Sequence, residues 1–137
     1  MFRATPSTPP ILVAAFGAKV FGIEMSSGKR LWRTPLELAV VLRVLVDGDI
    51  VLVLGSNLAC LELGSGRVLW KSELPSGLTS GTLLVHETFV FVGGAGEVAA
   101  FDKSTGRFLW HDGFKGEGLG GVALATPGTA AQYDRSG

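Results

Sequence analysis

The sequence predicts an all-β fold in which three four-stranded antiparallel sheets repeat along the chain. The first observation is a segment of the form Gly-basic-x-Leu-Trp that uses all three tryptophans, at Gly28–Trp32, Gly66–Trp70 and Gly106–Trp110. The second is its interval of about 40 residues, since periods of ~20–50 residues mark repeat architectures. The third is a series of short aliphatic segments bounded by glycine and other turn residues, with no stretch of helical periodicity.

Aligned on the tryptophans, each unit shows the same order of elements. A first central strand is expected at Leu12–Phe16, Ile50–Leu54 and Val90–Gly94. A second strand ends in an acid, at Val20–Glu24, Leu58–Glu62 and Val98–Asp102. A glycine turn and the Leu-Trp strand follow, and inner strands precede the later units at Val40–Val46 and Thr82–Val85. The predicted blades span residues 2–36, 38–75 and 79–114 of a single repeat domain.

Each turn before a Leu-Trp strand has a glycine at a fixed place, four residues after an acid. The glycines are Gly28, Gly66 and Gly106, and the acids are Glu24, Glu62 and Asp102. A glycine at a fixed turn position indicates backbone with positive φ. A carboxylate that accepts turn amides has a familiar structural role, so we expect these acids to be structural.

The motif of an acid, three residues and Gly-basic-x-Leu-Trp resembles the pyrroloquinoline-quinone-type β-propeller repeat. That repeat occurs in quinoprotein alcohol dehydrogenases and in an outer-membrane assembly lipoprotein of the same fold. The resemblance covers about Ile11 to Trp110 and implies propeller blades, four-stranded sheets arranged around an axis. It also implies that Trp32, Trp70 and Trp110 are clamps between blades, each with a turn glycine against its ring.

Three blades are fewer than the roughly four to eight that close a propeller. The first unit has only Phe2–Thr8 at its inner-strand position, whereas Gly121–Thr129 reads as a fourth inner strand. We therefore expect residues 119–127 to be exchanged into the first blade of a second copy, giving a homodimeric six-bladed ring. The alternative is a fragment of a longer propeller, or docking onto repeats of another protein. Residues 130–137 are expected to form a loose tail.

Composition excludes several classes of partner. Twelve basic and twelve acidic residues cancel, and no basic stripe points to nucleic acid. No apolar stretch approaches the ~20 residues of a membrane span. The start shows no secretory signal pattern, and the lone cysteine gives no cue for an oxidising compartment. These observations predict a cytoplasmic protein without membrane insertion.

The candidates for chemistry are few. His86 and His111 have no recognisable catalytic partner, and Cys60 is expected to be a buried, inert thiol. Asp47–Asp49 reads as a hairpin turn rather than a calcium loop, and Gly93–Gly96 joins two strands rather than opening a phosphate-binding helix. The quinone site of the resembled dehydrogenases needs adjacent cysteines and a further tryptophan, which are absent. We therefore expect no enzyme activity, no cofactor and no metal.

The sequence favours a non-enzymatic scaffold that binds itself and another protein. The equivalent turn positions Lys19, Asn57 and Glu97 differ in chemistry and are candidate contacts. One alternative is a small-ligand or carbohydrate-binding propeller with sites between blades. Another is a part of a larger propeller in a signalling or secretion machine.

Overall fold

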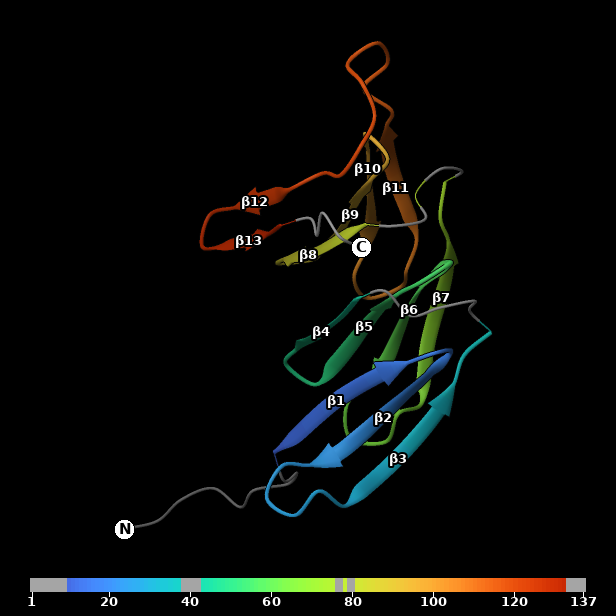
Figure 1. The fold of residues 1–137 in the computed structure, drawn as a ribbon, viewed down its shortest axis with the longest axis vertical. Helices are drawn as coiled ribbons and strands as arrows, with labels where there is room; N and C mark the ends of the chain where they lie inside the picture. Colours follow the sequence, from blue (N-terminus) through green and yellow to red (C-terminus); the bar gives the residue numbers. More distant parts are fainter. Residues whose placement is uncertain (1–9, 38–42, 76–77, 79–80, 133–137) are drawn as a thin grey trace.

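The computed structural model describes residues 10–37, 43–75, 78 and 81–132, which form antiparallel sheets joined by turns (Figure 1). The first sheet holds β1 (Ile11–Phe16), β2 (Lys19–Glu24) and β3 (Arg30–Pro35). The second holds β4 (Arg43–Asp47), β5 (Ile50–Leu54), β6 (Asn57–Glu62) and β7 (Val68–Glu73). The third holds β8 (Thr82–His86), β9 (Phe89–Gly94), β10 (Glu97–Asp102) and β11 (Phe108–Asp112). We call these sheets blades 1, 2 and 3.

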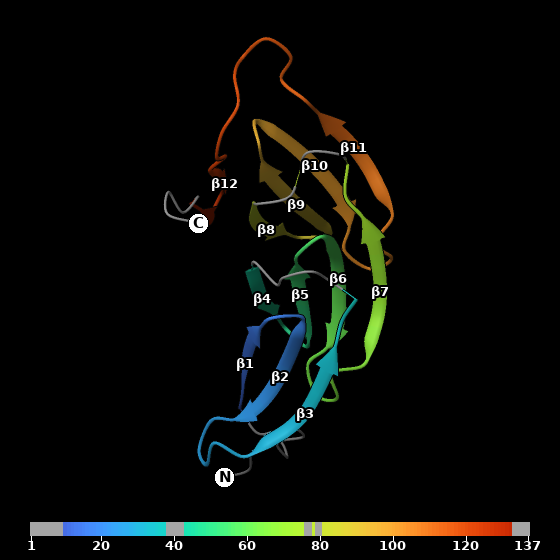
Figure 2. The ribbon, with the colours of Figure 1, turned by 45° about the vertical axis from the view of Figure 1, so that its right-hand side comes forward.

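The blades stack in sequence order along a curved line, as expected for part of a propeller (Figures 1 and 2). The outer strands β3, β7 and β11 lie on the convex side of this arc, and β4 and β8 lie on the opposite side (Figure 2). Blade 1 has three strands among the described residues, and the segment at its inner-strand position, Phe2–Thr8, lies outside them. The all-β, partial-propeller prediction is confirmed.

Two apolar layers hold the blades together. Alternate residues of β5 point to opposite faces of the sheet, so Val51 and Val53 pack toward blade 1 while Leu52 and Leu54 pack toward blade 3. All four side chains are buried. A strand covered on both faces loses the apolar–polar alternation of a half-exposed strand, which explains the uninterrupted aliphatic run of β5.

The predicted alignment of the first central strands was off by one residue. In the structure, Ile11, Ile50 and Phe89 are equivalent, because each pairs with the acid that ends the following strand. The prediction had matched Ile50 with Leu12 and Val90. The reason is the β5–β6 hairpin, in which 11 residues separate the paired Ile50 and Glu62, whereas 12 residues separate the corresponding pairs in blades 1 and 3.

After β11 the chain forms a glycine-rich loop and returns to the inner side of blade 3. There β12 (Leu124–Thr126) pairs with β13 (Thr129–Ala131) beside β8 (Figure 1). The Thr82 hydroxyl of β8 donates to the Val122 carbonyl at 2.8 Å, which ties this segment to blade 3. Residues 130 and 131, expected in a loose tail, are thus part of a strand, because they complete the short β12–β13 ladder.

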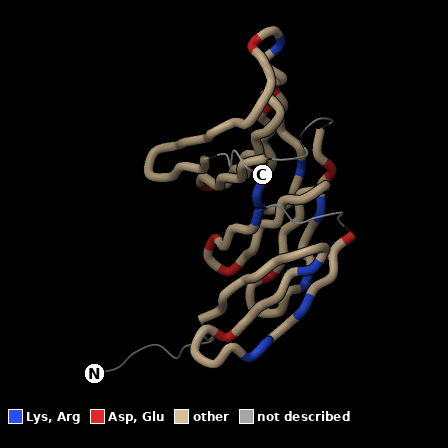
Figure 3. Tube along the Cα trace, in the orientation of Figure 1, with Lys and Arg blue, Asp and Glu red and all other residues tan. Residues whose placement is uncertain are grey.

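Charged residues of both signs are interspersed along the blades (Figure 3). The described residues hold no helix long and apolar enough to cross a membrane.

Candidate interaction site at the blade joints

The joint between blades 1 and 2 is built on Trp32. Its indole Nε1 donates to the Leu63 carbonyl oxygen of blade 2 at 2.7 Å. Two residues further along β3, the Thr34 hydroxyl donates to the Gly66 carbonyl oxygen at 2.6 Å. Gly66 is buried under the indole, and a Cβ atom added to it would lie 2.3 Å from Trp32 Cε3. Only glycine therefore allows this contact.

The joint between blades 2 and 3 repeats the same contacts. Trp70 Nε1 donates to the Lys103 carbonyl oxygen at 2.9 Å, and the Ser72 hydroxyl donates to the Gly106 carbonyl oxygen. A Cβ atom on the buried Gly106 would lie 2.3 Å from Trp70 Cε3. Each joint therefore consists of a tryptophan and a hydroxyl on one blade, set against a glycine turn on the next.

A β-bulge lies beside each tryptophan. The register of the middle and outer strands shifts between Gly22 and Ile23, between Cys60 and Leu61, and between Ala100 and Phe101. In each case the residue before the shift pairs with the tryptophan. Bulges re-aim side chains, so we infer that these shifts help to turn the indoles toward the next blade.

The repeated acids fix the turns that receive the indoles. Their main-chain oxygens accept the amide hydrogens of Gly28, Gly66 and Gly106 at 2.9, 2.7 and 2.7 Å. The Ser65 hydroxyl donates to the carboxylate of Glu62, lowering the pKa of this group, with Arg67 adding a smaller effect. The Asp102 carboxylate accepts from the Ser104 hydroxyl and amide, and these bonds lower its pKa.

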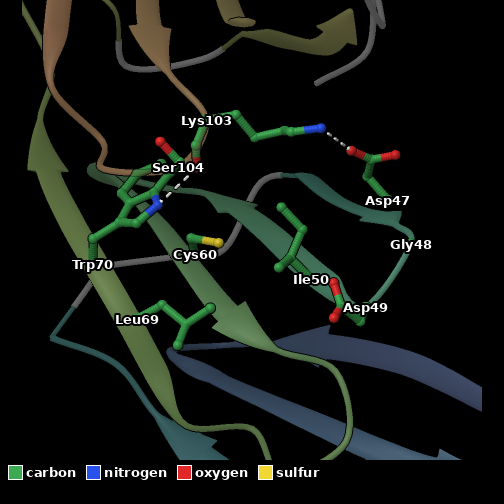
Figure 4. A pocket seen from close by; sticks show the side chains of 9 residues that line it. All are labelled: Asp47, Gly48, Asp49, Ile50, Cys60, Leu69, Trp70, Lys103 and Ser104. Atoms are coloured by element: carbon green, nitrogen blue, oxygen red, sulfur yellow. Dashed lines mark hydrogen bonds and ion pairs between the residues drawn. The ribbon is translucent and has the colours of Figure 1, made fainter. Parts of the chain in front are cut away.

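A pocket of about 390 Å³ lies beside the second joint (Figure 4). The Lys103 ammonium crosses from blade 3 to the Asp47 carboxylate at 2.8 Å, an ion pair between the two blades. Cys60 is buried here, and burial raises the pKa of its thiol to about 11, with Asp49 adding to the increase. The thiol is thus held protonated. Gly106 lies against one face of the Trp70 ring, so this face is not open to stacking by a sugar.

The outward face of blade 3 carries the third repeat tryptophan, which is exposed and not docked on another blade of the described chain. Trp110 is 45% exposed. It makes a tilted ring contact with Phe91, and its Nε1 has no hydrogen-bond partner in the described part of the chain. At the position of Thr34 and Ser72 stands Asp112, whose carboxylate accepts the Phe114 amide at 2.8 Å. We call the outward surface formed by Trp110, Asp112 and the neighbouring β12 the open joint.

The other predicted candidates lie in hairpin turns, and the first of them borders the pocket beside the second joint. Asp47–Asp49 forms the β4–β5 turn, and Gly93–Gly96 spans the end of β9 and the turn to β10. The described residues contain no group of three or more His, Cys, Asp or Glu that could hold a metal ion.

One side-chain pair and one position of the joints were not predicted from the sequence. His111 Nε2 lies 2.5 Å from Glu97 Oε1 on neighbouring strands of blade 3, whereas the sequence had shown no partner for His111 and had made Glu97 a candidate contact at a turn. The missed position is the hydroxyl two residues after Trp32 and Trp70. Its signal was present, because Thr34 and Ser72 share that spacing while Asp112 departs from it.

The comparisons agree with this architecture. The sequence profile of the outer membrane protein assembly factor BamB matches residues 54–128, more than half of the chain. The structure is similar to BamB from Moraxella catarrhalis, with a TM-score of 0.65 and 19% identity over 92% of this chain and 44% of that one. The chain thus spans less than half of that protein.

Two enzymes share the fold at lower coverage. A quinohemoprotein alcohol dehydrogenase from Comamonas testosteroni has a TM-score of 0.60 and 22% identity, over 74% of this chain and 19% of that one. A quinohemoprotein alcohol dehydrogenase from Pseudomonas putida HK5 has a TM-score of 0.63 and 19% identity, over 76% and 19%. No curated protein sequence matches the chain.

Proposed function

The chain belongs to the family of the outer membrane protein assembly factor BamB, and we propose that it is a non-enzymatic scaffold that binds protein through its open joint. The observation that carries this proposal is the state of Trp110. Its counterparts Trp32 and Trp70 each donate a hydrogen bond to the next blade, whereas Trp110 presents its indole to water. An exposed aromatic side chain on an apolar sheet face is typical of a protein interaction site.

The state of the titratable groups with shifted pKa values supports binding rather than catalysis. The Cys60 thiol packs in the second joint with a raised pKa, opposite to the shift of a catalytic thiolate. The shifted carboxyl groups of Glu62 and Asp102 are engaged by their own turns. The alternative of enzyme activity is favoured only by fold similarity to dehydrogenases, of which this chain spans about a fifth.

We further propose that the open joint is covered by a second copy, giving a homo-oligomeric ring. Two copies would bring six blades, within the range of about four to eight that closes a propeller. The β12 strand supports this arrangement, because it follows blade 3 at the place of a fourth inner strand. It would then serve as the inner strand of the partner's blade 1.

Light scattering on a sizing column tests this assembly. The proposed ring has a mass of twice 14.3 kDa. A single-chain mass at every concentration would contradict self-association. A stable complex with a different protein, in place of a dimer, would favour the other expected arrangement, in which this chain supplies blades to a larger propeller.

A further inference from the structure

The open joint of one copy has a complementary turn in this same chain. Gly66 and Gly106 are buried under Trp32 and Trp70, whereas the equivalent Gly28 is exposed, and no atom of the described residues beyond its chain neighbours lies within 4 Å of an added Cβ. Among the described residues, one repeat tryptophan and one repeat glycine turn therefore lack their neighbour. The glycine turn belongs to blade 1 and the tryptophan to blade 3, the blades at opposite ends of the stack (Figure 2).

The Gly28 turn has the conformation that receives an indole. Its φ is 77°, against 75° at Gly66 and 77° at Gly106. The residue whose carbonyl would accept the indole hydrogen is Met25, because the acceptors Leu63 and Lys103 also follow their acids directly. The amide of Met25 donates to the Pro10 carbonyl oxygen at 3.0 Å. The amides of Leu63 and Lys103 make the corresponding bonds, so all three turns are held alike.

A joint between two copies would lack one contact that both closed joints have. The Thr34 and Ser72 hydroxyls donate to the carbonyl oxygens of Gly66 and Gly106. The Asp112 carboxylate is an acceptor only, so it would place negative charge against the Gly28 carbonyl oxygen instead of a hydrogen-bond donor. An acceptor left without its donor in a contact that excludes water lowers affinity.

We propose that Trp110 of one copy docks on the Met25–Gly28 turn of a second copy, and that Asp112 makes this joint weaker than the two internal ones. This inference rests on the proposed self-association and names its contact. The indole Nε1 of Trp110 would donate to the Met25 carbonyl oxygen, with Gly28 against the ring. Asp112 is then a specificity-determining residue, which makes the joint between copies reversible while the internal joints stay closed.

The incoming blade also needs room beside β12. In the single chain this place is taken by β13, which pairs with β12 over only three residues. The longer β1 of the partner would replace β13. In its own blade β1 stands where the strand next to the inner strand belongs, and its edge away from β2 is unpaired among the described strands. A chain that ends before Thr129 should therefore associate at least as tightly as the full chain.

The test is a sedimentation dilution series on the full chain and three variants, with circular dichroism to check folding. Gly28→Asn keeps a residue that tolerates positive φ but adds a side chain where Trp110 would lie. Gly48→Asn is its matched control, because Gly48 also has positive φ and open space around it but lies in the β4–β5 turn. Asp112→Ser restores the hydroxyl of the internal joints.

The expected results are a loss of dimer for Gly28→Asn, no change for Gly48→Asn, and about tenfold tighter association for Asp112→Ser, the effect of one added hydrogen bond. Equal association of Gly28→Asn and the parent would overturn this contact but leave self-association standing. A parent that stays single while Asp112→Ser dimerises would support the contact and contradict the proposed ring of the parent protein. Single chains for every variant would overturn both.

Discussion

Two regions of the molecule carry the same tryptophan motif but differ in how far the tryptophan is buried. They are the joint between blades 2 and 3 and the outward face of blade 3. At the first, Trp70 is hydrogen-bonded to Lys103 and covers Gly106. At the second, Trp110 occupies the same strand position beside the same kind of bulge but stands 45% exposed. The repeat thus supplies only half of each joint, and the turn of the next blade supplies the rest.

The largest expected difference between the two regions comes from truncating the tryptophans. Trp70→Ala should lower the free energy of unfolding by about 3–5 kcal/mol, as aromatic truncations in cores do. Trp110→Ala should cost less than about 1.5 kcal/mol in dilute protein, because nearly half of that side chain is already in water. Urea unfolding of both variants measures the difference, and equal denaturant midpoints would show that Trp70 does not close a joint.

A second contrast uses two glycines with the same backbone conformation. Gly106→Ala and Gly28→Ala carry the same strain, since φ is 77° at both positions. Only at Gly106 would the new methyl group overlap an indole, 2.3 Å from Trp70 Cε3. Gly106→Ala should therefore be about 1–3 kcal/mol less stable than Gly28→Ala, the usual range for overpacking. Thermal unfolding at low protein concentration compares the two variants. An equal loss of stability in both would contradict the contact between Gly106 and Trp70.

A smaller effect is expected from the hydroxyl at the first joint. Thr34→Val removes the hydrogen bond to the Gly66 carbonyl oxygen while nearly preserving shape, and should cost about 1 kcal/mol. Thr34→Ser is the control, because it keeps the hydroxyl. Chemical denaturation of the two variants distinguishes the contribution of the hydrogen bond from that of packing. If Thr34→Val were as stable as Thr34→Ser, the hydroxyl would not stabilise the joint.

The smallest effect is the response of the turns to acid. The pKa values of Glu62 and Asp102 are lowered in the folded protein. Their contribution to stability is therefore present above the pKa of the unfolded chain, about 4, and is lost as the pH falls through the lower folded values. Unfolding measured between about pH 5 and pH 2 should show this decline. A double Glu62→Gln, Asp102→Asn variant should flatten it, and an unchanged slope would contradict the role of these carboxylates.

The sequence was sufficient to predict the blades, because the repeat fixes the period, the turn glycines and the strand edges. The register of the first central strands was missed, because the β5–β6 hairpin is one residue shorter than its counterparts, which is invisible without the pairing itself. The state of Trp110 could not be read from the motif, which is the same in all three copies. It depends on the next blade, and Asp112 was the only local sign that this copy differs.

Hydrogen exchange of the three indole N–H groups, followed by NMR in dilute protein, tests the tryptophan joints most directly. Slow exchange is expected for Trp32 and Trp70, whose indoles are hydrogen-bonded to the next blade. Fast exchange is expected for Trp110, slowing as the concentration rises and the second copy docks. Equal protection of all three indoles in the single chain, or equally fast exchange of Trp32 and Trp70, would contradict the division into closed and open joints.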